Sequence, residues 1–249
     1  MPKYAKPAGM ADISLLPDLL PPSDDSPIGA EGHRSRMRQR LLKSGPDALA
    51  DHEMLEMMLF LALPRRDTKP IARALLSRFG SFAAVIAAPV PELLGTDGLG
   101  EAGAAAVKLV QAAALRMVKH EVAARPVLSN WDRMIDYLTA SMAHERAEQF
   151  RILYLDARNH LLADEVQSRG TVDHAPVYPR EIVRKCLEHN ATALVLAHNH
   201  PSGEPTPSRQ DVAMTKAIDQ AVQTIGVTVH DHIIIGHGRC FSFRQEKLL

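Results

Sequence analysis

The chain has 249 residues, of which 46% are hydrophobic, and its 29 basic residues balance its 29 acidic ones. This length is enough for one large domain or two small ones, and the hydrophobic fraction is typical of a soluble globular protein. The zero net charge therefore predicts no class of partner for the chain as a whole.

Cysteine content and hydropathy bear on the compartment. Cys186 and Cys240 form no Cys-x-x-Cys pair, and a chain of this length needs no disulfide. The N-terminal lysines are not followed by an apolar segment, and no run of 18 apolar residues occurs. A reducing cytoplasm is the expected location, with no secretion signal and no membrane span.

The first half of the chain divides into two expected regions. Residues 1–32 mix prolines, serines and acidic residues, so this segment is expected to be disordered. Residues 33–122 are expected to form a small all-α domain, because apolar residues recur at helical spacing and glycines or prolines separate the helices. A linker is expected over residues 123–126, since the residue before Pro126 disfavours the helical conformation.

Basic side chains gather near the start of this helical region. They are Arg34, Arg36, Arg38, Arg40 and Lys43. Such a cluster could meet the phosphates of a nucleic acid, although a solvated helix face is the more common meaning of this pattern.

The second half of the chain, residues 127–249, alternates strand and helix patterns and is therefore expected to be α/β. Strands are expected over residues 150–155, 161–167, 193–197 and 227–235, and helices over residues 130–142, 179–189 and from Ser208 onward. Asn130 is a plausible helix cap. The apolar run over residues 193–197 is typical of a buried central strand.

Two histidines follow that central strand closely. His198 and His200 are two residues apart, so on an extended chain both imidazoles face the same way. A loop stiffened by prolines then leads to Ser208 and Asp211 at the start of a helix. Imidazole nitrogens and a carboxylate oxygen suit Zn²⁺, and three protein ligands leave a fourth position for water. We therefore expect His198, His200 and Asp211 to bind catalytic zinc.

Ser208-x-x-Asp211 also has a purely structural interpretation, because the same spacing forms a capping box at the start of a helix. The box alone would explain the serine and the acid, but it leaves the histidine pair unexplained. Both roles can hold at once. Asn199 points away from its neighbours on a strand, which favours packing or a backbone hydrogen bond for it.

The spacing His198-x-His200-x7-Ser208-x2-Asp211 matches the JAMM (MPN+) motif at every position. The wider sequence resembles the RadC-like bacterial proteins (UPF0758 family) over residues 33–249, through His198–Gly203, Gly170-Thr171, Tyr178–Glu181 and Asp231–Gly236. This resemblance implies a mixed sheet of the cytidine-deaminase-like type with helices on its faces. It also implies a zinc-dependent metallopeptidase or isopeptidase that cleaves a peptide or isopeptide bond.

The resemblance further implies catalytic roles for two side chains. Ser208 would stabilise the tetrahedral intermediate, and a glutamate upstream would be the general base. Glu148 occupies the corresponding place, while Glu145, Glu165 and Glu181 are its competitors. His230 and His232 are also two residues apart, and structural or supporting roles are favoured for them over a second metal site.

The glycine turn at Gly98 and Gly100 resembles a helix-hairpin-helix element, whose backbone N–H groups bind phosphate without reading sequence. An ordinary turn between helices is the alternative, because such turns also need glycine. Two classes of function therefore stay open. One is a zinc hydrolase; the other is a nucleic-acid-associated protein, related to DNA repair, that binds DNA weakly and has an accessory zinc domain.

Overall fold

The computed structural model describes residues 30–170 and 177–249. The chain divides into two compact units, Met1–Leu49 and Ala50–Leu249. In the first unit, the described residues form the helix α1 (Ala30–Ser44) and the short 3-10 helix η3 (Pro46–Ala48). The disorder expected for residues 1–32 falls almost wholly outside the described residues, and residues 30–32 belong to α1.

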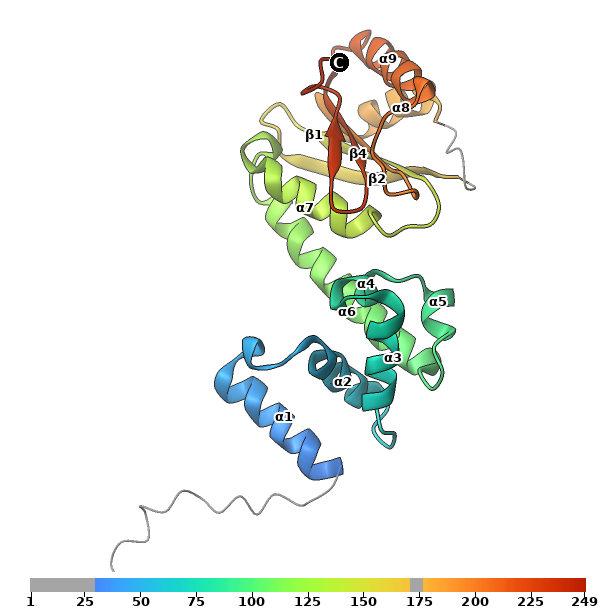
Figure 1. Cartoon of the computed structure of the whole chain (residues 1–249). Coiled ribbons are helices and arrows are strands. Elements are labelled where there is room, and N and C mark those ends of the chain that lie inside the picture. Colours follow the sequence, from blue (N-terminus) through green and yellow to red (C-terminus); the bar gives the residue numbers. More distant parts are fainter. Residues whose placement is uncertain (1–29, 171–176) are drawn as a thin grey trace, which may run out of the picture. The chain divides into compact units, whose positions relative to one another are not determined.

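The second unit begins with helices that pack around a hydrophobic core of their own (Figure 1). They are α2 (Asp51–Ala62), α3 (Lys69–Phe79), α4 (Phe82–Ala87), α5 (Val90–Leu94) and α6 (Gly100–Ala123). Their shared core includes Leu55, Leu59, Leu75, Val85, Leu93, Leu99 and Val107. The all-α character expected for this region is confirmed.

The long helix α6 leaves this core and ends against the sheet that follows. Val122, near its end, is fully buried among residues of the sheet. One turn earlier, Lys119 Nζ lies 3.0 Å from a carboxylate oxygen of Asp164. Any fragment that begins at residue 127 would lose both contacts, so the boundary at residues 123–126 stays a prediction.

A short 3-10 helix, η4 (Val127–Asn130), connects α6 to α7 (Trp131–Met142). Asn130 stands at the expected position before α7, but its side chain does not cap that helix. The Asn130 amide instead donates to the carbonyl oxygen of Glu121 over 3.3 Å, which ties the end of α6 to the start of α7.

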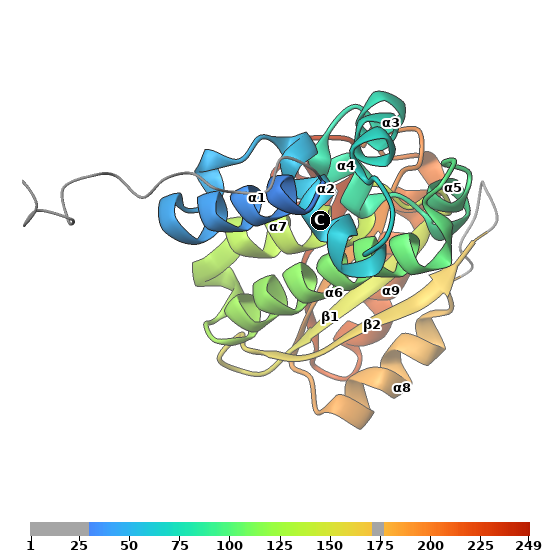
Figure 2. The ribbon, with the colours of Figure 1, turned by 90° about the horizontal axis from the view of Figure 1, so that it is seen from below.

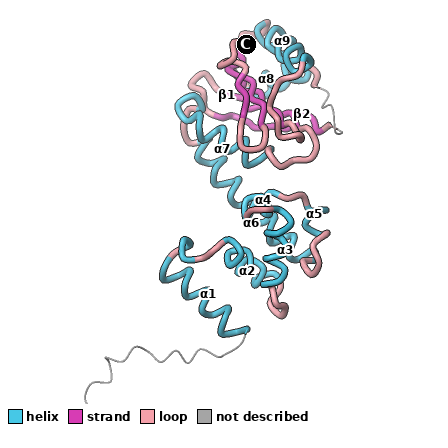
Figure 3. Tube along the Cα trace, in the orientation of Figure 1, coloured by secondary structure: helices cyan, strands magenta, loops and turns pink. Residues whose placement is uncertain are grey.

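Within the described residues, five strands form one mixed sheet in the order β2-β1-β3-β4-β5. The strands are drawn in magenta in Figure 3. The strands are β1 (Gln149–Leu155), β2 (Leu161–Arg169), β3 (Ala193–Asn199), β4 (Thr228–Ile235) and β5 (Cys240–Ser242). β3 and β4 are parallel, and the other neighbouring strands are antiparallel. The remaining helices, α8 (Pro179–His189) and α9 (Arg209–Gln223), precede and follow β3.

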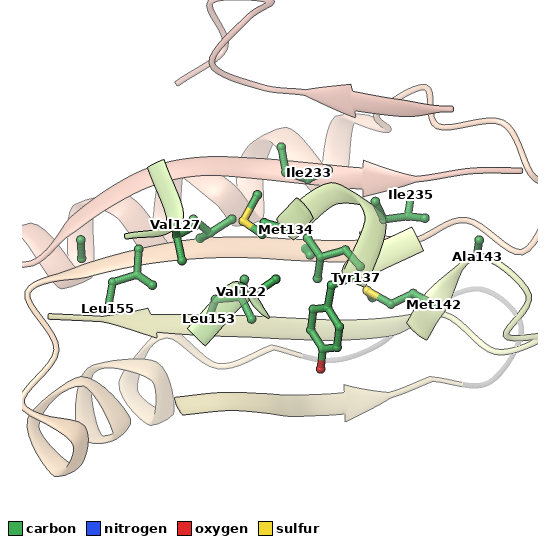
Figure 4. Packing of buried hydrophobic residues seen from close by; sticks show 14 residues of the cluster. Val122, Val127, Met134, Tyr137, Met142, Ala143, Leu153, Leu155, Ile233 and Ile235 are labelled. Carbon is green, nitrogen blue, oxygen red and sulfur yellow. The ribbon is translucent and has the colours of Figure 1, made fainter. Parts of the chain in front are cut away.

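Helices cover both faces of the sheet (Figure 2). Successive residues of each central strand point to opposite faces, so apolar side chains are buried on both. On one face, Leu153, Val195 and Ile233 pack under α7 and the end of α6, as Figure 4 shows for part of this cluster. On the other face, residues such as Leu196 and Val229 pack under α8 and α9. The expected fold class, an all-α region followed by a mixed sheet with helices on its faces, is confirmed.

The topology of the sheet indicates where a functional site would lie, at the edge where two parallel strands end. β3 and β4 are parallel and are connected by α9, so their carboxyl ends lie at the same edge of the sheet. Ligands of α/β sheets commonly bind outside the carboxyl ends of the strands. The chain leaves β3 at that edge and enters α9 from it.

Candidate metal centre

The end of β3 carries both expected histidine ligands. His198 lies within the strand, opposite Phe150 of β1, and is fully buried. His200 follows the strand directly, is only partly buried, and donates its backbone N–H to the Ile235 carbonyl of β4 over 3.0 Å. The two Nε2 atoms are 3.0 Å apart. The alternation of a regular strand therefore brings the two rings together, as the sequence predicts.

The start of α9 supplies the third side chain. Ser208 Oγ accepts from the Asp211 N–H over 3.1 Å, and the Ser208 N–H donates to Asp211 Oδ2 over 2.7 Å. This is the full capping box. Asp211 Oδ1 nevertheless also lies 3.4 Å from His198 Nε2, and Oδ2 lies 3.7 Å from His200 Nε2. The structural role and the ligand position therefore coexist in one carboxylate.

The donor set fits a zinc ion. One atom from each of His198, His200 and Asp211 lies within 4.8 Å of the others, and among the described residues this is the group that could hold a metal ion. His200 Nδ1 donates to the carbonyl oxygen of Glu204 over 2.8 Å, which leaves Nε2 for the cluster. Two imidazole nitrogens and a carboxylate leave a fourth tetrahedral position open, and lone pairs this close repel unless a cation or a proton lies between them.

Burial and charge set the protonation of these groups. Burial lowers the pKa of His198 to about 4, so its ring is neutral near pH 7. Burial alone would raise the pKa of Asp211, but the hydrogen bonds with His200 and Ser208 lower it overall. The hydrogen bond to Asp211 raises the pKa of His200. Protons therefore compete with a cation mainly at His200, and acid should weaken metal binding.

Glu148 is the glutamate that the structure brings beside this cluster. It is half-buried, directly precedes β1, and its negative charge contributes to raising the pKa of His200. Glu165 instead bonds His189 over 2.8 Å, near α8. Glu181 bonds Arg184 over 3.0 Å on the exposed side of that helix. These contacts favour Glu148 over Glu165 and Glu181 by position.

Asn199, between the two histidines, holds the segment that carries Glu148. Its Oδ1 accepts from the Gln149 N–H over 2.8 Å, and its amide donates to the carbonyl oxygens of Glu145 and Ala147, each over 3.2 Å. A strand alternates its side chains, so the residue between two ligands points to the opposite face and reaches the neighbouring segment. Asn199 thus makes the backbone hydrogen bonds that its position in the strand favours.

The second histidine pair does not form a comparable cluster. The β3–β4 register skips His230, because Leu194 is opposite Val229 and Val195 is opposite Asp231. This β-bulge turns His230 away from His232. His232 contacts His198, with 2.7 Å between His232 Nε2 and His198 Nδ1.

Sequence reasoning missed one residue near the centre. Thr215 is buried and contacts His232 Nδ1 over 2.6 Å. It lies four residues after Asp211, so on a helix the two occupy the same face. That spacing is the signal by which it could have been found.

The residues expected to bind nucleic acid lie in different units. Arg34, Arg36, Arg38, Arg40 and Lys43 are on α1 of the first unit, where all but Arg34 are exposed. Gly98 and Gly100 lie in an exposed turn at the start of α6 in the second unit, with φ angles of 80° and 61° that favour glycine. Leu99 between them is buried in the helical core, and Arg66 donates to the Gly98 carbonyl over 2.7 Å.

Comparisons with known proteins match both parts of the chain. The model of the RadC-like JAB domain matches residues 128–248, and that of the UPF0758 N-terminal domain matches residues 31–105. A UPF0758 protein of Rhodobacter capsulatus is 54% identical over 213 residues, which cover 86% of this chain and 100% of that protein. The chain belongs to the UPF0758 family. The expected resemblance to RadC-like proteins is thereby confirmed.

Membership in the UPF0758 family fits the geometry of the cluster. The RadC-like JAB domain is related to the JAMM/MPN metallohydrolases, and its matched range contains His198, His200 and Asp211. In the part of the chain that the structure describes, no helix combines the length and apolar character needed to cross a membrane.

Proposed function

We propose that this UPF0758 protein is a zinc-dependent hydrolase that cleaves an amide bond of a peptide or isopeptide. The observation that carries the proposal is the convergence of His198, His200 and Asp211, with the charge of Glu148 acting on the same cluster. Relationship to the JAMM/MPN metallohydrolases supports the reaction class.

His198 and His200 would hold zinc through Nε2, and Asp211 through its carboxylate. Zinc, when bound, would lower the pKa of a water molecule to about 7 and polarise the substrate carbonyl. Glu148 would accept the proton of the attacking water and deliver it to the leaving amine. Glu148 is half-buried, and its charge acts on His200.

Ser208 would stabilise the negative charge that develops on the substrate carbonyl oxygen. Its oxygen accepts the Asp211 N–H, but the hydroxyl hydrogen is left for another acceptor. The side chain is exposed at the start of α9, where substrate can reach it. Donors that are oriented before the reaction commonly contribute much of the catalysis in acyl transfer.

The first test replaces the proposed base. Glu148→Gln should keep about one zinc per chain, because the residue is not a ligand, and should lower turnover by roughly 100-fold or more. Zinc content is measured by atomic absorption, and hydrolysis by a library of quenched fluorescent peptides together with lysine-linked isopeptides.

Glu181→Gln is the matched control for this variant, because Glu181 is an exposed glutamate paired with arginines away from the cluster. It should keep full activity. Turnover that survives in Glu148→Gln but disappears in the Glu165 or Glu181 variant would move the role to that residue. A zinc-loaded wild-type protein that cleaves no member of the library would contradict amide hydrolysis.

As an alternative function we propose weak, sequence-independent DNA binding by the helical region, with the zinc domain accessory. Two observations favour it. No side chain caps the start of α6, so no capping side chain accepts hydrogen bonds from the first N–H groups of this helix. The Arg66 guanidinium also adds positive charge beside the exposed Gly98–Gly100 turn.

This alternative is tested by titrating labelled duplex DNA with the full chain at several salt concentrations. The expected Kd is about 10⁻⁴ to 10⁻⁶ M at physiological salt, with a log–log salt slope of about −0.9 per phosphate neutralised. Replacing the five basic residues of α1 by glutamine should flatten the slope, and His198→Ala should leave it unchanged. No binding even at low salt would leave the turn as a packing device.

A further inference from the structure

A buried line of hydrogen bonds begins on one proposed zinc ligand and ends on another. The Thr215 hydroxyl donates to the carbonyl oxygen of Asp211 over 2.6 Å. Thr215 Oγ1 also lies 2.6 Å from His232 Nδ1, and His232 Nε2 lies 2.7 Å from His198 Nδ1. Thr215 is 1% exposed, and both histidines are fully buried. Water therefore has little access to these groups.

The direction of each bond follows from the first one. A carbonyl oxygen only accepts, so the single hydroxyl hydrogen of Thr215 is committed to Asp211. Thr215 Oγ1 must then accept from His232, which puts the His232 proton on Nδ1. A neutral imidazole has one ring hydrogen, and the contact with Thr215 uses it at Nδ1. His232 Nε2 is therefore an acceptor, and His198 Nδ1 carries the hydrogen that it accepts.

His198 can hold its proton in a competing position. With the proton on Nε2, His198 would donate toward Asp211 Oδ1, 3.4 Å away. That arrangement would satisfy the carboxylate without a metal and would place a hydrogen where a cation has to sit. The hydrogen bond to His232 opposes it, because His232 Nε2 needs a donor.

We propose that Thr215 and His232 are positioning residues that keep the proton of His198 on Nδ1 and so leave its Nε2 lone pair free for zinc. The proposal rests on the zinc site of the proposed function. Partners of this kind behind a metal-binding histidine commonly change metal affinity by 10- to 100-fold.

A packing role is the rival explanation for His232. Its ring stacks on Phe243 at 4.6 Å between centroids and meets the edge of Phe150 at 5.5 Å. Loss of the histidine would therefore disturb the core whether or not the hydrogen bonds matter. The test consequently changes Thr215 and leaves both aromatic contacts in place.

The experiment compares Thr215→Val, which keeps the shape but removes the hydroxyl, with Thr215→Ser, which restores it. Zinc affinity of the full chain is measured at fixed pH by competition with a chromophoric chelator. Thr215→Val should bind zinc roughly 10- to 100-fold more weakly, and Thr215→Ser should bind close to wild type. Thr224→Val is the matched control. It removes a hydroxyl that donates to the Ala221 carbonyl on the same helix, outside this line, and should leave the affinity unchanged.

A second measurement needs no zinc. In ¹⁵N-histidine-labelled, metal-free wild type at pH 8, ¹⁵N shifts should show His198 and His232 both protonated at Nδ1, and Thr215→Val should shift His198 toward the Nε2–H form. Wild-type protein with His198 protonated at Nε2 overturns the proposal. So does undiminished zinc affinity in Thr215→Val, which would leave the zinc site itself intact. A wild type that binds no zinc would instead contradict the proposed function.

Discussion

Two His-x-His sequences lie on adjacent parallel strands, yet only one of them forms a cluster. At the end of β3, the Nε2 atoms of His198 and of His200, which follows the strand, are 3.0 Å apart. On β4, His232 reaches His198, whereas His230 Nε2 bonds Asn159 over 2.6 Å at the turn between β1 and β2. Identical spacing in sequence therefore gave two different outcomes in space.

The difference comes from the backbone and not from the histidines. β3 is regular up to Asn199, so residues two apart share a face. β4 has a bulge at His230, which reverses the alternation at that point. His230 then lines a hollow with Leu128 and Trp131 on the α7 side, while His232 contacts Thr215 of α9. A spacing rule for metal ligands holds only where the strand is regular.

The largest expected effect separates the two pairs by metal binding. His198→Ala or Asp211→Ala should lose most of the bound zinc, because each removes one of three ligands. His230→Ala should keep about one zinc per chain, since its ring faces away from the cluster. Atomic absorption on dialysed protein measures both. Full zinc retention in the two ligand variants would refute the site.

An intermediate effect concerns the pH dependence of stability in metal-free protein. Burial holds the pKa of His198 at about 4, below its usual 6.5. The unfolded chain therefore takes up a proton near pH 6.5 that the folded chain refuses. Stability should be highest above pH 7 and should fall by about 3 kcal/mol from this residue as pH drops from 6.5 to 4.

Urea unfolding of chelator-treated protein across this pH range measures the effect. The burial of His232 also lowers its pKa and adds in the same direction. His198→Gln should make the decline shallower. A free energy of unfolding that stays constant between pH 7 and pH 5 would contradict the assignment of His198 as a buried neutral ring.

The smallest expected effect comes from the other pair. His230→Gln and Asn159→Gly each remove the same hydrogen bond, and each should lower the free energy of unfolding by about 1 kcal/mol, with zinc retained. Glycine suits position 159, because its φ is 63°. Since the bond is shared, the double variant should cost less than the sum of the two changes. Additive costs would show that the bond does not stabilise the fold.

Local signals predicted much of the fold. The expected bounds of α8 match the structure, because this helix has a proline in its first turn and a residue suited to a left-handed conformation, Asn190, after its last. The helix α4 and the short strand β5 were not foreseen. Both are too short for periodicity to reveal and depend on the surfaces that they pack against.

The candidate site was predictable where one stretch of chain supplies it. His198, His200, Ser208 and Asp211 fall within fourteen residues, and the spacing alone indicates their convergence. The bulge at His230 and the contact of Thr215 with His232 could not be predicted, because both depend on the register between β3 and β4. Register is a property of paired strands, which no single segment encodes.

The backbone of Gly203 passes close to the backbone of Gly236 near the candidate metal centre, and this contact bears on how the site assembles during synthesis. A Cβ on Gly236 would lie 2.3 Å from the Gly203 carbonyl oxygen, and that oxygen accepts the His237 N–H over 3.0 Å. The loop that carries His200 is thus held by the end of β4, which follows the last ligand by more than twenty residues. A nascent chain therefore exposes every side chain of the proposed zinc site before the strand that orders them has been made. Zinc that meets such a chain early would find mobile ligands, and the finished geometry would arise only when the parallel pairing of β3 with β4 closes.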